Sequence, residues 1–235
     1  MGDSVHVWVA PAGAESRATA HALLLDLAST LVSSPSLHHA DNGQPYVDGL
    51  AVSLSHSRNL VVVAASLSGP LGVDVEDVHP REVTALAQRW FDPAELQWMS
   101  EQPDHLIAFL HLWTAKEAVG KAVGQGLRNA GLRRRMPLPA DPAERGSASA
   151  AGLTLHAGPV PGTAGLLRSA PVANPGVGPG DAGELVVMHV PWVGAVVAVA
   201  AGPGVSDVLV TAHHGVALRR TVTSRTSFPV VVRGS

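Results

Sequence analysis

The stretch WTAKEAVGK, residues 113–121, contains both lysines of this 235-residue chain, Lys116 and Lys121. Every other basic residue is arginine, although the chain carries 16 lysines and arginines in total. A lysine is a compact point charge on a flexible stem, and it can lose its proton when it is buried. Two lysines on either side of a carboxylate, Glu117, therefore indicate a site. The alternative is an exposed helix with an ordinary ion pair between Glu117 and Lys121.

The spacing within this stretch predicts a helix that runs from about Asp104 to Val123. Trp113, Glu117 and Lys121 then follow one another at i, i+4 and i+8. We expect one face of the helix to present this aromatic side chain, the carboxylate and both ammonium groups, while alanine and valine side chains pack inward. An ion pair alone explains the spacing but not the tryptophan or the choice of lysine.

A second acidic motif, GVDVE, occupies residues 72–76. If it is a strand, Asp74 and Glu76 point to one face and the two valines to the other. Two neighbouring carboxylates are costly to ionise unless a cation lies between them. Carboxylate oxygens favour Mg²⁺, which binds one or two carboxylates together with water and phosphate oxygens. A solvated acidic face on an edge strand is the equally open alternative.

The third motif is SLSHS, residues 53–57, at the end of a predicted strand. Ser55 and His56 are adjacent on an extended chain, so their side chains point apart and cannot form a nucleophile–base pair. Hydroxyls and an imidazole at a strand end suit phosphate binding better. Taken alone, a capping or turn role for the serines is the simpler interpretation.

Composition limits the function classes. A hydrophobic content of 46% indicates a folded protein, and the net charge of −3 gives no electrostatic case for nucleic-acid binding. The absence of cysteine excludes disulfides and thiolate chemistry and fits a reducing cytoplasm. We find no signal-peptide pattern and no apolar run of the roughly 18 residues that a membrane span needs.

The order strand, helix, strands occurs twice along the chain, which suggests two similar halves. We expect an N-terminal half at 1–69, a C-terminal half at 70–205 and a tail at 206–235 to which the sequence assigns no role. The predicted elements are strands at 5–10, 51–57, 59–66, 71–78, 152–158, 184–191 and 194–202, and helices at 15–32, 81–99 and 104–123.

Together, SHS, GVDVE and WTAKEAVGK resemble, in this order, the 4′-phosphopantetheinyl transferases of the Sfp type. The resemblance extends over roughly residues 15–135 and includes RWFDPAE (89–95) and FLHLW (109–113). It implies an α+β fold in which a pseudo-two-fold pair of similar α/β halves lies within one monomeric chain. Coenzyme A would bind in the cleft between these halves.

The resemblance also implies a reaction. Such enzymes transfer the phosphopantetheine arm of coenzyme A to a serine of an apo acyl- or peptidyl-carrier protein and release 3′,5′-ADP. By resemblance, Asp74, Glu76 and Glu117 would hold Mg²⁺, or Mn²⁺ in its place. The general base would be Glu95 or Lys121, and we favour Glu95.

Further residues follow from the same resemblance. Ser55 and His56 would contact the 3′-phosphate of coenzyme A, and Lys116 and Lys121 would lie against the other phosphates. The family often has a basic residue before the proline of the preceding loop, whereas this chain has Gln44-Pro45. Coenzyme A would then bind more weakly, or Arg17 and His21 would make up the lost contact. Arg128 and Arg133 would steer an acidic carrier protein, or form a solvated basic loop.

Two other classes remain open. One is a non-catalytic binder of coenzyme A or carrier protein on the same fold, and the other is a magnesium-dependent phosphohydrolase. The sequence does not distinguish fatty-acid, polyketide and non-ribosomal peptide carriers.

Overall fold

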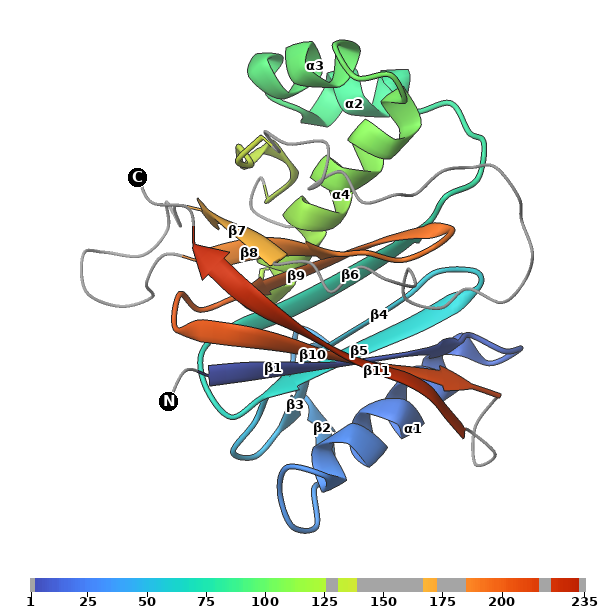
Figure 1. Ribbon diagram of the computed structural model, residues 1–235, viewed down its shortest axis with the longest axis vertical. Coiled ribbons are helices and arrows are strands. Elements are labelled where there is room, and N and C mark those ends of the chain that lie inside the picture. The colour runs from blue at the N-terminus through green and yellow to red at the C-terminus, as the bar shows by residue number, and fades with distance from the viewer. Residues whose placement is uncertain (1–2, 126–130, 139–166, 173–184, 216–220, 233–235) are drawn as a thin grey trace.

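The computed structural model describes residues 3–125, 131–138, 167–172, 185–215 and 221–232. The chain folds into an α+β structure in which helices cover both ends of a strongly curved sheet (Figure 1). The strand predicted at 152–158 lies outside the described residues, as does Arg128. Among the described residues, none of the helices combines the length and the hydropathy that crossing a membrane requires.

The first part of the chain forms one helix and a group of strands in which β5 is central. β5 pairs antiparallel with β1 on one side and with β4 on the other. The elements are β1 (Asp3–Pro11), α1 (Ser16–Ser29), β2 (Leu37–His39), β3 (Pro45–Val47), β4 (Ala51–His56) and β5 (Leu60–Ser66). The short β2–β3 hairpin lies within the stretch that the sequence indicated as a loop.

The second part repeats this arrangement with β9 as the central strand. β9 pairs antiparallel with β6 and with β8. The elements are β6 (Leu71–Asp77), α2 (Thr84–Trp90), α3 (Pro93–Ser100), α4 (His105–Ala122), the 3₁₀ turn η1 (Gly131–Arg133), β7 (Leu167–Val172), β8 (Leu185–Val190) and β9 (Ala195–Ala201). The helical region predicted at 81–99 divides at Asp92, which caps α3 with its side chain.

The segment that the sequence left without a role joins the two parts. It supplies β10 (Val205–His214) and β11 (Thr221–Val232). β10 pairs parallel with β1 and antiparallel with β11, and β11 continues to β7. Phe228 of β11 is fully buried. The end of the chain is therefore an integral part of the sheet between the two groups of strands (Figure 1).

Three apolar clusters give the structure its layers. Valines of β1, β5, β6 and β9 form a central core between the two groups of strands, with Val7, Val62, Val73 and Val197 fully buried. The leucines of α1 pack on the outer face of the first group, and α4 packs on the outer face of the second. Strands buried on both faces explain the nearly continuous apolar runs in the sequence.

The two edge strands of the sheet, β4 and β6, lie side by side. The described strands follow the order β4-β5-β1-β10-β11-β7-β8-β9-β6, so these two strands stand at opposite ends. The curvature of the sheet nevertheless brings them together (Figure 1). At this contact between β4 and β6, the SLSHS motif meets the GVDVE motif.

Candidate active site

The acidic strand β6 lies directly against the lysine helix α4. At Gly72, an added Cβ would lie 1.9 Å from the carbonyl oxygen of Ala118. No side chain fits at that distance, so glycine is required for the helix backbone to approach the strand so closely. This approach places the carboxylates of β6 beside the last turns of α4, as the two motifs indicated separately.

Asp74 is the meeting point of the two motifs. Its Oδ1 accepts a 2.7 Å hydrogen bond from Lys121 Nζ and another of 2.7 Å from Ser55 Oγ. The ammonium of Lys121 also donates to the carbonyl of Val73 at 3.0 Å. Asp74 is buried, and both donors converge on the same oxygen of its carboxylate.

Alternate serines of SLSHS bind β6 by their hydroxyls. Ser53 Oγ accepts from the amide of Val73 at 3.0 Å, and Ser57 Oγ donates to Asp77 at 2.8 Å. Ser55 takes the middle position, with its bond to Asp74. These hydroxyls join two strands that share no backbone ladder among the described residues. The hydroxyl of Ser55, expected at a phosphate of coenzyme A, is buried and donates to Asp74, and its phosphate contact stays a prediction.

The three predicted metal-binding carboxylates lie close enough to affect one another. Burial and the charges of Asp74 and Glu76 raise the pKa of Glu117 to about 7, while Lys121 acts in the opposite direction. Glu76 itself forms an ion pair with Arg81 at 2.8 Å. Burial is the largest cause of the raised pKa of Glu117, and the two neighbouring anions add to it.

The donor set fits Mg²⁺, although the side chains are turned to other partners. Across the described part of the chain, no group of three acidic or imidazole side chains converges tightly enough to hold a metal. Asp74 faces Lys121 and Glu76 faces Arg81. These carboxylates, together with Glu117, are hard oxygen ligands that would bind the ion once they turn toward one another.

Lys116 and Glu95 form a separate, fully buried ion pair. Lys116 Nζ lies 2.8 Å from Glu95 Oε1, and both side chains have no exposed surface. The ammonium also donates to the carbonyl of Arg134 and lies 5.3 Å from the centre of the Phe91 ring. Burial lowers the pKa of Lys116, and the carboxylate of Glu95 opposes that effect.

This pair corrects the expectation that both lysines share one helix face. Five residues turn an α-helix by about 140° beyond a full turn, so Lys116 points toward α3 while Lys121 points toward β6. Glu95, the favoured general base, accepts from Lys116, from Met136 N at 2.7 Å and from Asp92 N at 2.9 Å. The phosphate contact of Lys116 and the general-base role of Glu95 stay predictions.

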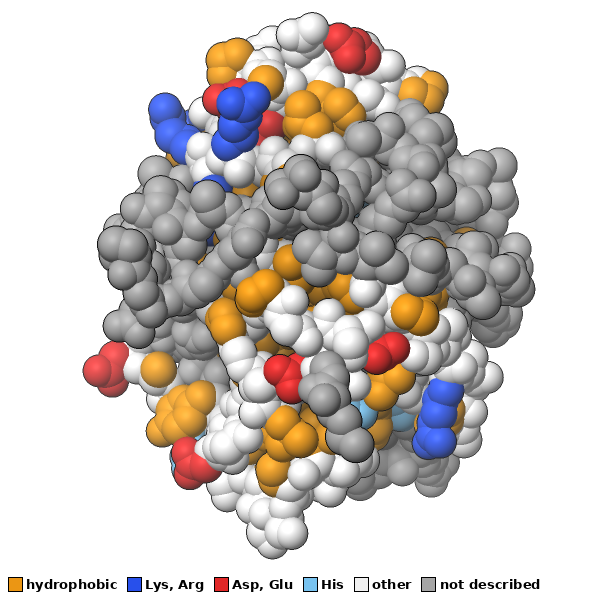
Figure 2. Space-filling model, turned by 60° about the vertical axis from the view of Figure 1, so that its left-hand side comes forward, with side chains coloured by type: hydrophobic (Ala, Val, Ile, Leu, Met, Phe, Trp, Pro, Cys, Tyr) orange, Lys and Arg blue, Asp and Glu red, His pale blue; other side chains and the backbone are white. Residues whose placement is uncertain are grey.

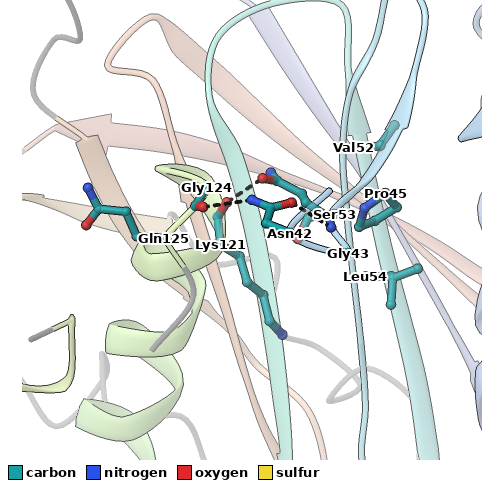
Figure 3. A pocket seen from close by; sticks show the side chains of 10 residues that line it. Asn42, Gly43, Pro45, Val52, Ser53, Leu54, Lys121, Gly124 and Gln125 are labelled. Atoms are coloured by element: carbon teal, nitrogen blue, oxygen red, sulfur yellow. Dashed lines mark hydrogen bonds between the residues drawn. The ribbon is translucent and has the colours of Figure 1, made fainter. Parts of the chain in front are cut away.

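A cavity of about 460 Å³ lies beside Lys121, between the β2–β3 hairpin, β4 and the end of α4 (Figure 3). The predicted Gln44 and Pro45 line it. The remaining lining residues are Asn42, Gly43, Val52, Ser53, Leu54, Gly124 and Gln125. The structure therefore brings Gln44, Pro45 and Lys121 to one cavity.

The other predicted coenzyme A residues lie outside that lining. His56 is exposed at the end of β4, and its Nδ1 lies 3.4 Å from the hydroxyl of Ser16. Arg17, next along α1, is exposed as well. These side chains form a second polar position at the start of α1.

The predicted partner-binding Arg133 lies by α2. Its guanidinium is 5.8 Å from the centre of the Trp90 ring, and that of Arg89 is 5.1 Å from the same centre. Basic side chains also gather in the upper part of the face in Figure 2, at the height of α2 and α3. The arginines and tryptophan form a basic and aromatic surface.

Sequence reasoning missed several residues of the site. Asn42, Ser53, Ser57 and Asp77 were not singled out, although serines at alternate positions of SLSHS were a visible signal of one strand face. Arg81 was missed because nothing local to it indicates a bond to Glu76.

Comparisons with known proteins agree with these motifs. Residues 70–157 match the model of the 4′-phosphopantetheinyl transferase superfamily. The chain is 38% identical over 82 residues, 34% of its length, to "4′-phosphopantetheinyl transferase HetI" of Nostoc sp., of which the match covers 35%. It is 30% identical over 131 residues, 52% of its length, to "Putative 4′-phosphopantetheinyl transferase" of Haemophilus influenzae, of which 56% is covered.

A third relative, "4′-phosphopantetheinyl transferase psf-1" of Bacillus pumilus, is 37% identical over 91 residues, 37% of this chain and 38% of the relative. The chain thus spans between about a third and just over half of the length of these curated relatives. The matched family segment contains β6, α4 and the carboxylates and lysines that they carry.

Proposed function

Since residues 70–157 match the model of the 4′-phosphopantetheinyl transferase superfamily, we propose that this protein is a 4′-phosphopantetheinyl transferase. It transfers the phosphopantetheine arm of coenzyme A to a serine of an apo acyl- or peptidyl-carrier protein and releases 3′,5′-ADP. The observation that carries the proposal is the contact of β6 with α4, because it brings Asp74, Glu117 and Lys121 together.

The proposed reaction is a single displacement at one phosphorus of coenzyme A. The serine oxygen bonds to the phosphorus next to pantetheine, and the bond from that phosphorus to the bridging oxygen breaks. The leaving 3′,5′-ADP takes the electron pair of that bond, and water at the site accepts the serine proton. Phosphoryl transfer of this kind depends on positioning and on neutralising charge. A resident Mg²⁺, or Mn²⁺, would neutralise charge on the pyrophosphate, held by Asp74, Glu76 and Glu117.

We assign Lys121 the role of a cation beside the pyrophosphate. Its ammonium already acts as a donor to two oxygens, and its side chain keeps 27% of its surface exposed. Lys121→Arg preserves the charge but cannot accept a proton, so we expect turnover to stay within about tenfold of the wild-type value. A loss of about 100-fold or more would instead make Lys121 the general base.

The two groups of strands support a pseudo-two-fold arrangement within the proposal. In each, a β-α-β-β path ends on a strand that pairs antiparallel with both neighbours, β5 in one and β9 in the other. We propose residues 1–69 and 70–205 as these halves, with coenzyme A between them. The cavity at Gln44 and Pro45 would take part of the molecule, and His56 and Arg17 would hold its 3′-phosphate. Removing the charge of Arg17 should raise KM for coenzyme A.

The carrier protein would dock on the basic surface at Arg133, with Arg128 in support. Carrier modification should then slow as salt increases, because such steering is screened. We propose a cytoplasmic monomer whose partners are carrier proteins and coenzyme A, not nucleic acid or membranes.

One assay tests the proposed function. The protein is incubated with an apo carrier protein, coenzyme A and Mg²⁺, and the carrier is weighed by mass spectrometry. A mass gain of one phosphopantetheine supports the transferase. Breakdown of coenzyme A without labelling indicates a phosphohydrolase, and unchanged carrier and coenzyme A indicate a non-catalytic binder. Fatty-acid, polyketide and peptide carriers are compared in parallel to identify the substrate class.

A further inference from the structure

The turn between β2 and β3 is locked to the end of α4 by two side-chain amides. Asn42 Nδ2 donates to the carbonyl of Gly124 at 3.1 Å, and Gln44 Nε2 donates to the carbonyl of Lys121 at 3.3 Å. Figure 3 shows Asn42 reaching across to Gly124 beside Lys121. These bonds connect residues about 80 positions apart in the chain, from the first half to the second.

Hydrogen bonds within the turn determine which atom of the Asn42 amide is left to donate. Asn42 Oδ1 accepts from the backbone amide of Gln44 at 3.0 Å, so its nitrogen is the atom left to donate. The amide of Gly43 bonds to the carbonyl of Ala40 at 2.8 Å, and Gly43 adopts φ +83. The turn therefore presents two donors on a rigid support.

The end of α4 is the natural acceptor for these donors. The carbonyls at the end of a helix carry its partial negative charge, and each has two lone pairs, so the Lys121 carbonyl can accept a second donor besides its backbone partner. Gly124 ends the helix at φ +69, and its amide bonds back to the carbonyl of Lys121 at 3.0 Å. A Cβ at Gly124 would lie 3.0 Å from Gln44 Oε1, so the two segments are in close contact.

Lys121 is consequently held at both ends. Its carbonyl receives the amide of Gln44, and its ammonium is bound to Asp74 and to the carbonyl of Val73. A lysine side chain has large rotational freedom, and fixing its backbone reduces the number of positions that its ammonium visits. We call the two bonds from Asn42 and Gln44 to the end of α4 the clamp. The clamp restricts the position of the Lys121 ammonium, the cation that we assign to the pyrophosphate.

We infer that Asn42 and Gln44 are positioning residues that hold Lys121 in place, and that Gln44 serves this purpose rather than binding a phosphate. The inference rests on the proposed function for its consequence in catalysis. Gln44 is the position at which the family often has a basic residue and at which the sequence therefore indicated a phosphate contact without its charge. The inference predicts that loss of the amide donors loosens the end of α4 and lowers kcat more than it raises KM for coenzyme A.

The first test needs no substrate. Gln44→Met keeps the length of the side chain and removes the donor, and Asn42→Asp keeps the acceptor of the turn while removing the donor to Gly124. Hydrogen exchange of the backbone amides at 121–125 should become about fivefold faster in each free protein, as expected for the loss of one hydrogen bond. Gln97→Ala removes an exposed amide that bonds to Glu101 on α3 and should leave this exchange unchanged.

The second test uses coenzyme A and an apo carrier protein. Gln44→Met should lower kcat by about fivefold with a smaller change in KM, and Gln44→Lys should restore both exchange and kcat because its ammonium is again a donor at a helix end. Unchanged exchange in both donor-free variants overturns the inference. So does faster exchange with normal kcat, or a rise confined to KM. If the wild-type protein modifies no carrier, the proposed function fails, while the exchange measurement still decides whether the clamp exists.

Discussion

Ser55 Oγ lies 2.7 Å from Asp74 Oδ1, across the contact between the two edge strands of the sheet. This bond joins the end of β4 to a carboxylate of β6. The same oxygen also accepts from the ammonium of Lys121, so the position of Asp74 depends on both β4 and α4.

Removing the Ser55 hydroxyl should disturb the site more than the fold. Ser55→Ala leaves the buried Asp74 with one donor fewer, and we expect a loss of about 1 kcal/mol in the free energy of unfolding. Carrier modification should require more Mg²⁺, because Asp74 is less well oriented. Urea unfolding and a Mg²⁺ titration of the rate measure the two effects.

Ser57→Ala provides the matched control for this change. It removes the neighbouring hydroxyl, which donates to Asp77 instead of Asp74. We expect Ser57→Ala to lower the free energy of unfolding about as much as Ser55→Ala does, and to leave the Mg²⁺ concentration needed for carrier modification unchanged. Equal effects of both variants on the Mg²⁺ requirement would contradict a specific role for Ser55.

Breaking the buried ion pair should destabilise the protein strongly. Lys116→Met leaves the carboxylate of Glu95 charged and enclosed, and such a change costs about 3–5 kcal/mol. Adding Glu95→Gln removes the charge and keeps one acceptor oxygen, which can serve either Met136 N or Asp92 N, so the double variant should recover part of the loss. The free energies of unfolding in urea give the comparison. A double variant no more stable than Lys116→Met alone would argue against the pair as the cause.

The raised pKa of Glu117 predicts a pH dependence of stability without metal. Its folded pKa of about 7 exceeds the ordinary carboxyl value of 4.5, so the folded state keeps the proton to a higher pH than the unfolded chain does. This contribution to stability is complete below about pH 4.5 and is lost as the pH rises through about 7. We expect a loss of about 2 kcal/mol, after allowing for the partial exposure of the side chain.

Urea unfolding in EDTA between pH 5 and pH 8 tests this effect. Glu117→Gln should flatten that part of the profile, and Mg²⁺ at pH 8 should restore stability to the wild-type protein. Glu101→Gln on α3 serves as a control outside the site. A profile for Glu117→Gln that still follows the wild type would refute the assignment.

The close approach of β6 and α4 can be tested at Gly72. Gly72→Ala adds a Cβ within 1.9 Å of the Ala118 carbonyl, so the helix must move away from the strand. We expect about 3 kcal/mol or more of destabilisation, together with loss of activity. Gly202→Ala is the control, because its added Cβ meets its nearest neighbour at an ordinary 3.6 Å. Thermal unfolding of both variants is the measurement, and similar melting temperatures would contradict the packing described here.

Local sequence patterns predicted the main helices and strands and the chemistry of their side chains. Apolar runs of valine defined β5 and β9, and helical spacing defined α4 from about Asp104 onward. The motifs GVDVE and WTAKEAVGK indicated the family, and the match to residues 70–157 agrees. These features are local, because a strand or helix imposes its period on consecutive residues.

The partners of each side chain were decided only by the tertiary structure. Lys116 and Lys121 belong to the same short motif, yet Lys116 is buried in an ion pair with Glu95, whereas Lys121 forms an ion pair with Asp74. Likewise, the final segment forms strands beside β1, and Gln44 meets the end of α4. Such contacts join residues far apart in the chain, and they depend on how a curved sheet brings its edges together. No pattern in consecutive residues predicts that the two edges of the sheet meet. The partners of these residues could therefore be identified only from the fold.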